Sequence, residues 1–196
     1  MYTVIGNVKT RALRVTWTLE ELGQPYDLIP AAPASDEAKQ HVPTGKIPGL
    51  LLDGQIYTDS VAIMTFLADR HGALTYPAGT PDRMTQDGHI HFLNEEFDSL
   101  LWMASKHKFL LPKDLRVPAV RNGLEWDYQR SLDRLTDRLG DGPFLMGDTV
   151  TIADLLAAHC LNWAFASDFP AAPPVLADYA RRMRHRPSYR AALDRA

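Results

Sequence analysis

The first 75 residues alternate between short apolar runs and one stretch in which apolar positions recur at helical spacing. Residues 2–5 and 26–29 are short runs rich in strand-forming residues, and the stretch from Thr10 to Leu22 has the helical period. A helix between two strands forms a β-α-β unit, in which the strands are parallel and the crossover is right-handed. The chain is therefore predicted to begin with such a unit.

A β-hairpin and a further helix follow. Residues 50–52 and 55–58 are apolar runs separated by Asp-Gly, the pair that favours a two-residue hairpin turn. Helical spacing resumes over residues 60–70, and the intervening segment 31–42 is Pro- and Ala-rich and irregular. The predicted order of elements in this half is β-α-β, an irregular helix, then β-β-α.

After residue 75 the strand signals stop. Long helical patterns cover residues 82–109 and 120–139, and further helices are predicted to begin at Thr151, Pro174 and Pro187. Thr151 and Asp154 have the spacing of a capping box, so they are predicted to start a buried helix. We expect an α/β domain over residues 1–75, a linker over 76–82 and an all-helical domain over 83–196.

The composition of the chain restricts the classes of function that it can have. Hydrophobic residues make up 45% and charged residues 23%, which is ordinary for a globular protein, and the net charge of −3 predicts no nucleic-acid or membrane partner. The N-terminus lacks the pattern of a signal peptide, so a cytoplasmic location is expected. Cys160 is the single cysteine, which excludes an internal disulfide, and no spacing predicts a metal site.

Four stretches carry a resemblance to a known family. They are TRALRVTWTLEELGQPYDL (10–28), GKIPGLLLDG (45–54), YTDSVAIMTFLADRHG (57–72) and FLMGDTVTIADLLAA (144–158). Together they make the chain similar to the cytosolic glutathione transferases of the bacterial type. The resemblance implies a thioredoxin-like α/β domain joined to a helical-bundle domain, a homodimer, and glutathione as co-substrate without a metal.

The resemblance also implies how glutathione is held. Ile47-Pro48 would form a cis peptide bond, so that the backbone of Ile47 pairs with the cysteinyl part of glutathione. Asp59 and Ser60 would hold the γ-glutamyl group at a helix N-terminus, and Lys46 would pair with the glycine carboxylate. The alternatives are a trans proline that opens an edge strand, a plain helix N-cap and a solvated lysine.

Two residues are candidates for activating the thiol. A free thiol has a pKa of about 8.5 and only the thiolate attacks electrophiles, so a hydrogen-bond donor is needed near the start of the first helix. Thr10 stands about where the family has its serine, and Asn7 matches members that use asparagine. We place Thr10 ahead of Asn7, while each has a plain structural alternative as an N-cap or a loop residue.

The second substrate is expected in a pocket lined by Val8, Trp102, Met103 and Phe109, although bulky apolar residues are also typical of a core. The predicted reaction is attack of the bound thiolate on a small electrophile or a peroxide. The alternative is a non-catalytic binding or regulatory protein that keeps the fold, because a fold does not establish a function.

Overall fold

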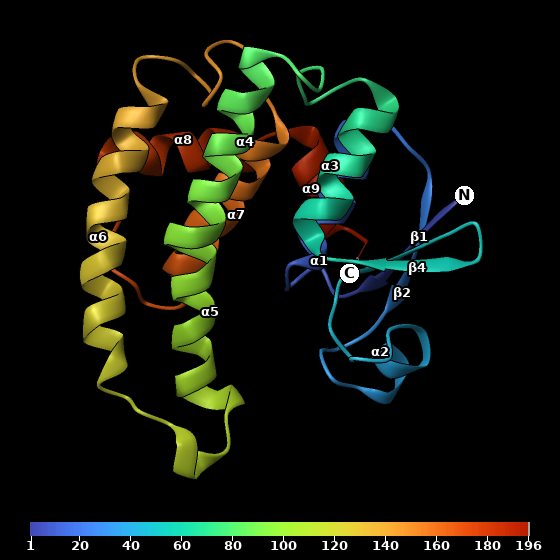
Figure 1. Ribbon diagram of the computed structural model, residues 1–196, viewed down its shortest axis with the longest axis horizontal. Coiled ribbons are helices and arrows are strands. Elements are labelled where there is room, and N and C mark those ends of the chain that lie inside the picture. The colour runs from blue at the N-terminus through green and yellow to red at the C-terminus, as the bar shows by residue number, and fades with distance from the viewer. Residues whose placement is uncertain (196) are drawn as a thin grey trace. The chain divides into compact units, whose positions relative to one another are not determined.

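The computed structural model describes residues 1–195 and begins with a four-stranded mixed sheet (Figure 1). Its strands lie in the order β2-β1-β3-β4; β1 pairs with β2 in parallel, and the two other pairings are antiparallel. The parallel pairing of β1 with β2 and the hairpin of β3 with β4 are predicted from the sequence, and the pairing of β1 with β3 is added by the structure. The strands are β1 (Tyr2–Gly6), β2 (Tyr26–Pro30), β3 (Gly49–Leu52) and β4 (Gln55–Thr58).

Helices cover both faces of the sheet. Because side chains alternate along a strand, Tyr2 and Val4 of β1 pack with apolar residues of α1 and α3, whereas Ile5 packs on the other face with Ala38 of α2. Figure 1 shows α3 and α2 on opposite sides of the strands. The helices are α1 (Ala12–Glu21), α2 (Asp36–His41) and α3 (Ser60–His71).

After β4, the described part of the chain contains isolated β-bridges but no further strand. The helix predicted over residues 82–109 is divided by the π-helical turn η1 and ends in a second one, η2, each of five residues. The elements are α4 (Pro81–Leu93), η1 (Asn94–Asp98), α5 (Ser99–Ser105), η2 (Lys106–Leu110), η3 (Lys113–Leu115), α6 (Val120–Leu139), α7 (Ile152–Ala166), α8 (Pro174–Arg184) and α9 (Pro187–Leu193).

The chain forms two compact units that differ from the predicted domains at the C-terminal end. The first unit contains residues 1–80 together with 183–196, and the second contains 81–182. The helical domain predicted over 83–196 therefore extends too far, because α9 packs on α1 of the first unit. A helical pattern gives the length of α9 but not the surface that its apolar side chains cover.

Polar and aromatic contacts join α9 to α1. The Arg186 guanidinium donates two hydrogen bonds to the Glu21 carboxylate, at 2.5 and 2.8 Å, and the Ser188 hydroxyl donates a third. The rings of Trp17 and Tyr189 meet edge to face with centroids 4.8 Å apart. Burial alone would raise the pKa of Glu21, but the hydrogen bonds and the charge of Arg186 outweigh burial and lower it.

The second unit is centred on α7, whose N-terminus is the predicted capping box. Thr151 is the N-cap, and the buried carboxylate of Asp154 accepts hydrogen bonds from the amides of Thr151 and Leu145, both at 2.8 Å. The Tyr179 hydroxyl donates another at 2.8 Å. No helix in the part of the chain that the structure describes is long and apolar enough to cross a membrane.

Candidate functional site

The register of the sheet assembles the predicted site at one edge. Ile5 pairs with Gly49 across β1 and β3, and Gly49 pairs with Thr58 across β3 and β4. The residues that follow this row, Gly6 and Asp59, and the residue that precedes it, Pro48, therefore emerge side by side. The loop before α1, the Ile-Pro loop and the start of α3 all meet at this edge.

The Ile47-Pro48 peptide bond is cis, as predicted. A Cβ placed on Gly6 would lie 3.5 Å from the Ile47 Cβ, 3.7 Å from the Pro48 Cα and 2.7 Å from the Ala12 Cβ. Only glycine fits that last distance, so Gly6 lets the end of β1, the cis loop and the start of α1 pack together. Pro48 is buried, Ile47 is half-buried and Lys46 is exposed.

The backbone of Ile47 forms no hydrogen bond with any residue in the range 1–195. The antiparallel ladder begins at Gly49, so the proline leaves no gap in the sheet. Ile47 as a residue is half-buried, and its peptide N–H and carbonyl are left without a protein partner among the described residues. These two groups are available to an extended ligand that lies alongside them.

Asp59 is the N-cap of α3, in an unusual backbone conformation with φ of 74°. Its Oδ1 atom accepts hydrogen bonds from the amides of Val61, at 3.0 Å, and Ala62, at 2.9 Å. Its Oδ2 atom has no hydrogen-bond partner among residues 1–195, and the side chain is exposed. Asp59 is therefore a helix N-cap, which is the structural alternative to a binding role, and capping leaves its Oδ2 atom open.

Ser60 is the first residue of α3 and is almost fully buried. In the first turn of α3, the backbone N–H of Ser60 has no acceptor among the described residues. Its hydroxyl oxygen accepts a hydrogen bond from Arg14 Nη1 at 3.2 Å. Arg14 lies in α1 and is only 1% exposed. Arg14 is not among the residues predicted from the sequence, although an arginine between Leu13 and Val15 on the apolar face of a helix is a signal for a specific buried contact.

The loop from Asn7 to Thr10 is a closed turn. The Thr10 amide donates to the Asn7 carbonyl at 2.9 Å, and the Thr10 hydroxyl donates to the same oxygen at 2.6 Å. The Thr10 hydroxyl also accepts a hydrogen bond from the Ala12 amide at 3.2 Å. Since a hydroxyl has one hydrogen, the donor capacity of the Thr10 side chain is used within its own turn.

The Asn7 side chain is arranged differently. Its Oδ1 atom accepts a hydrogen bond from the Lys9 amide at 2.8 Å, which fixes the orientation of the carboxamide. Its Nδ2 atom has no acceptor among residues 1–195, and the residue is half-buried. The loop therefore presents two side-chain N–H groups from Asn7 and no spare hydroxyl hydrogen from Thr10.

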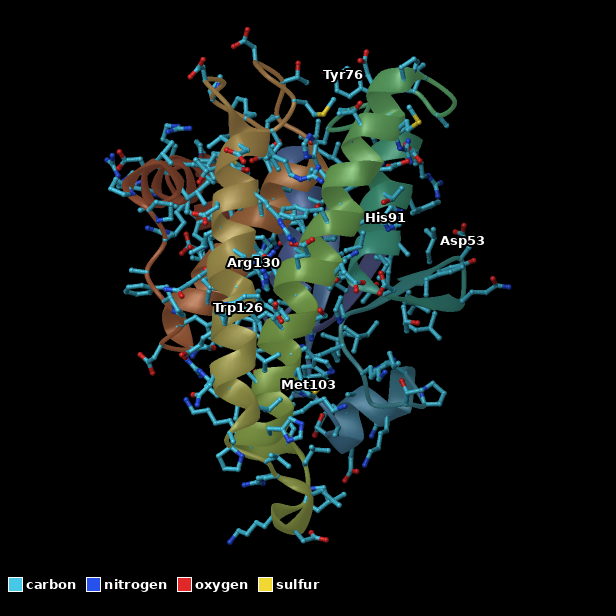
Figure 2. All side chains as sticks on the ribbon, turned by 60° about the vertical axis from the view of Figure 1, so that its left-hand side comes forward. Asp53, Tyr76, His91, Met103, Trp126 and Arg130 are labelled. Atoms are coloured by element: carbon cyan, nitrogen blue, oxygen red, sulfur yellow. The ribbon has the colours of Figure 1, made fainter. Side chains whose placement is uncertain are left out.

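The predicted second-substrate residues lie in both compact units. Val8 belongs to the first unit and is 3% exposed, so it is part of a core. Trp102, Met103 and Phe109 belong to the second unit and are 40%, 36% and 58% exposed. Figure 2 shows Met103 on α5. Their exposure is compatible with a binding role but does not define a pocket.

Two hollows in the structure are lined by other residues. One of about 520 Å³ is formed by α4, η1 and α6 and includes His91, Glu95 and Arg138. One of about 400 Å³ is formed by α1 and α9 and includes Glu20 and Arg186. No group of three histidine, cysteine or acidic residues within 1–195 is placed to hold a metal ion.

Comparisons with known proteins support the sequence resemblance. The family model for the N-terminal domain of glutathione S-transferase matches residues 10–70, and that for the C-terminal domain matches residues 119–182. Glutathione S-transferase GstA of Escherichia coli O157:H7 is 29% identical over 161 residues, covering 77% of this chain and 74% of that protein. Glutathione S-transferase 2 of Caenorhabditis elegans is 31% identical over 133 residues, covering 63% and 66%.

A solved structure agrees over nearly the whole chain. The crystal structure of a glutathione transferase from Methylococcus capsulatus strain Bath superposes with a TM-score of 0.85 and 26% identity, covering 99% of this chain and 98% of that one. Both domain models therefore match in chain order, and the thioredoxin-like domain and the helical domain both have counterparts. The chain belongs to the glutathione S-transferase family.

Proposed function

We propose that the protein is a glutathione transferase that binds glutathione at the sheet edge formed by the three loops, stabilises its thiolate and promotes attack on a small electrophile. The observation that carries the proposal is the sheet register, because it brings Asn7, Ile47 and Asp59-Ser60 to one edge. Family membership supports glutathione as the ligand. The glutathione-binding unit would then be the first compact unit.

The cysteinyl and glycyl parts of glutathione would lie along the Ile-Pro loop. The unpaired amide and carbonyl of Ile47 offer two main-chain hydrogen bonds, as in the addition of a short strand. Lys46 is exposed beside this position, so its ammonium group can reach the glycine carboxylate. An exposed ion pair of this kind contributes at most about 1 kcal/mol, so the main-chain bonds dominate.

The γ-glutamyl group would bind at the start of α3. A carboxylate is stabilised at a helix N-terminus by the free amides and the helix dipole, and Ser60 supplies the amide that has no partner. The open Oδ2 atom of Asp59 is an acceptor for the γ-glutamyl ammonium group. Asp59 would thus cap its helix with one oxygen and hold the ligand with the other.

The thiolate would accept a hydrogen bond from Asn7. The sequence alone favours Thr10, but the Thr10 hydroxyl hydrogen is engaged by the Asn7 carbonyl, and the Asn7 Nδ2 hydrogens have no acceptor among residues 1–195. A donor to the anionic form lowers the thiol pKa, so a larger fraction of bound glutathione is ionised at neutral pH. Thr10 would instead hold the turn that presents Asn7.

The reaction needs no covalent enzyme intermediate. The glutathione thiol loses its proton to solvent, and the thiolate lone pair forms the bond from sulfur to the electrophilic atom. In a substitution, the leaving group departs with the electrons of the bond that breaks. In an addition, the π electrons of an activated double bond shift onto its activating group, and that site then takes a proton from solvent. The protein contributes positioning and stabilisation of the anion. Peroxide reduction, the second-substrate pocket, the homodimer and the cytoplasmic location stay predictions.

Binding to glutathione immobilised on a resin tests the proposal. We expect retention and release by free glutathione, followed by turnover with at least one member of a panel of model electrophiles and hydroperoxides. The panel also identifies the class of second substrate. Retention without any turnover would favour the non-catalytic alternative, and failure of retention by the folded protein would contradict the proposed site.

A further inference from the structure

The segment of residues 106–117 between α5 and α6, here called the tip, concentrates positive charge. Lys106, Lys108 and Lys113 are half of the six lysines in the chain, and Arg116 adds a fourth cation against the single acid Asp114. The chain as a whole has a net charge of −3, so the tip is a local reversal of sign. Whole-chain charge, on which the sequence analysis relied, conceals it.

The same segment exposes aliphatic and aromatic side chains. Phe109 is 58% exposed, Leu110 45%, Leu115 57% and Val117 54%. Single exposed apolar residues are normal on a protein surface, but four within nine residues form a cluster that calls for a partner. Figure 1 shows the tip projecting beyond the ends of α5 and α6 within the second unit.

Hydrogen bonds within the tip hold this surface in place. Arg116 donates from Nε to the Leu111 carbonyl at 2.7 Å and from Nη2 to the Phe109 carbonyl at 2.8 Å. The Val117 amide donates to His107 Nδ1 at 3.1 Å. Within residues 1–195 the three lysines of the tip form no ion pair. The folded tip therefore presents both unpaired cations and apolar side chains.

We propose that the tip docks onto the surface of a membrane that contains anionic phospholipid. Leu110 and Leu115 would enter the boundary between headgroups and acyl chains, and Lys108 and Lys113 would contact the negatively charged headgroups. Lysine suits this position because its aliphatic stem lies on the apolar layer while its ammonium group stays among the headgroups.

Charge complementarity favours lipid over other acidic partners. Single-stranded nucleic acids are bound by cations together with aromatic rings that stack on bases, and the tip has one phenylalanine among its exposed apolar residues. Leucine and valine gain by leaving water for an apolar layer. At physiological salt, charges beyond about 8 Å are largely screened, so the local excess of positive charge in the tip counts for more than the net charge of the whole chain.

Flotation with phospholipid vesicles tests this inference independently of glutathione binding. We expect the protein to float with phosphatidylcholine vesicles that contain phosphatidylserine, at least about tenfold more than with phosphatidylcholine alone, and to be released by about 0.5 M salt. Equal flotation with both vesicle types, no flotation with either, or preferential binding of a DNA fragment would overturn the inference.

Paired substitutions locate the contact. L110S combined with L115S, and K108E combined with K113E, should each reduce flotation about tenfold or more. The controls make comparable changes elsewhere, an exposed apolar pair to serine and an exposed cationic pair to glutamate: M84S with V175S, and K39E with R190E. Circular dichroism checks folding. Wild-type flotation by both tip variants, or an equal loss in the controls, would contradict a contact through the tip.

Discussion

The N-termini of α3 and α7 each place an aspartate carboxylate on backbone amides, and they differ in what they leave open. Asp59 caps α3 from the protein surface, and both its Oδ2 atom and the Ser60 amide lack partners among the described residues. Asp154 at α7 is buried and accepts hydrogen bonds from Leu145, Thr151 and Tyr179. The start of α3 therefore keeps one acceptor and one donor without partners within residues 1–195, whereas the carboxylate at the start of α7 is fully engaged.

This difference in unpaired groups shows how to distinguish a ligand-binding helix N-terminus from one that only stabilises the fold, when both begin with a capping residue. A polar residue before an apolar helix predicts a cap in either case. Burial raises the pKa of Asp154, and four hydrogen bonds to its carboxylate oppose that effect, so this carboxylate is committed to the fold. The unused acceptor and the unused amide at α3 are what indicate a ligand.

The largest expected effect is on the closed helix start. D154A removes an acceptor and leaves several buried donors unsatisfied, which should lower the free energy of unfolding by about 3 kcal/mol or more. Chemical denaturation measures the loss. Glutathione affinity of the fraction that remains folded should be unchanged, and a stability loss below about 1 kcal/mol would mean that the network contributes little.

The open helix start should respond in both stability and affinity. D59A is expected to lower the free energy of unfolding by about 1 kcal/mol, as for loss of an N-cap, and to weaken glutathione binding about tenfold through loss of the Oδ2 contact. Denaturation and titration calorimetry measure the two effects.

D59N is the matched control, because asparagine keeps a capping oxygen but loses the charge. It should restore most of the stability while binding stays weak. If D59N binds glutathione as tightly as the wild type, Asp59 is a cap and nothing more.

Much of this architecture could be predicted from the sequence, because it is encoded locally. The Asp-Gly turn and the capping box of α7 each follow from residues no more than three positions apart in the chain, whereas the cis bond at Ile47-Pro48 is implied by the family resemblance; all three are observed. The packing of α9 on α1 and the contact of Arg14 with Ser60 join residues far apart in the chain. Local patterns carry no information about such pairings.

The order of Thr10 and Asn7 could not be settled from the sequence for a related reason. Both residue types can donate a hydrogen bond, and the choice depends on which hydrogens the turn already uses. Only the folded loop reveals that the Asn7 carbonyl engages the Thr10 hydroxyl and that the Lys9 amide engages Asn7 Oδ1.

The smallest expected effect is therefore at Thr10. T10V removes the hydroxyl and keeps the shape, so it should lower the free energy of unfolding by about 1 kcal/mol through loss of the turn hydrogen bond. The pKa of bound glutathione thiol should change little. T10S, which keeps the hydroxyl, is the control; a thiol pKa raised by T10V but not by T10S would return the donor role to Thr10.

The absorbance of the glutathione thiolate bound to the protein, titrated from about pH 5 to about pH 9, tests the central claim most directly. The account predicts a thiol pKa at least about one unit below the free value of about 8.5 in the wild type, and a rise of about one unit in N7A. A wild-type pKa equal to that of free glutathione, or an N7A titration that coincides with the wild type, would contradict it.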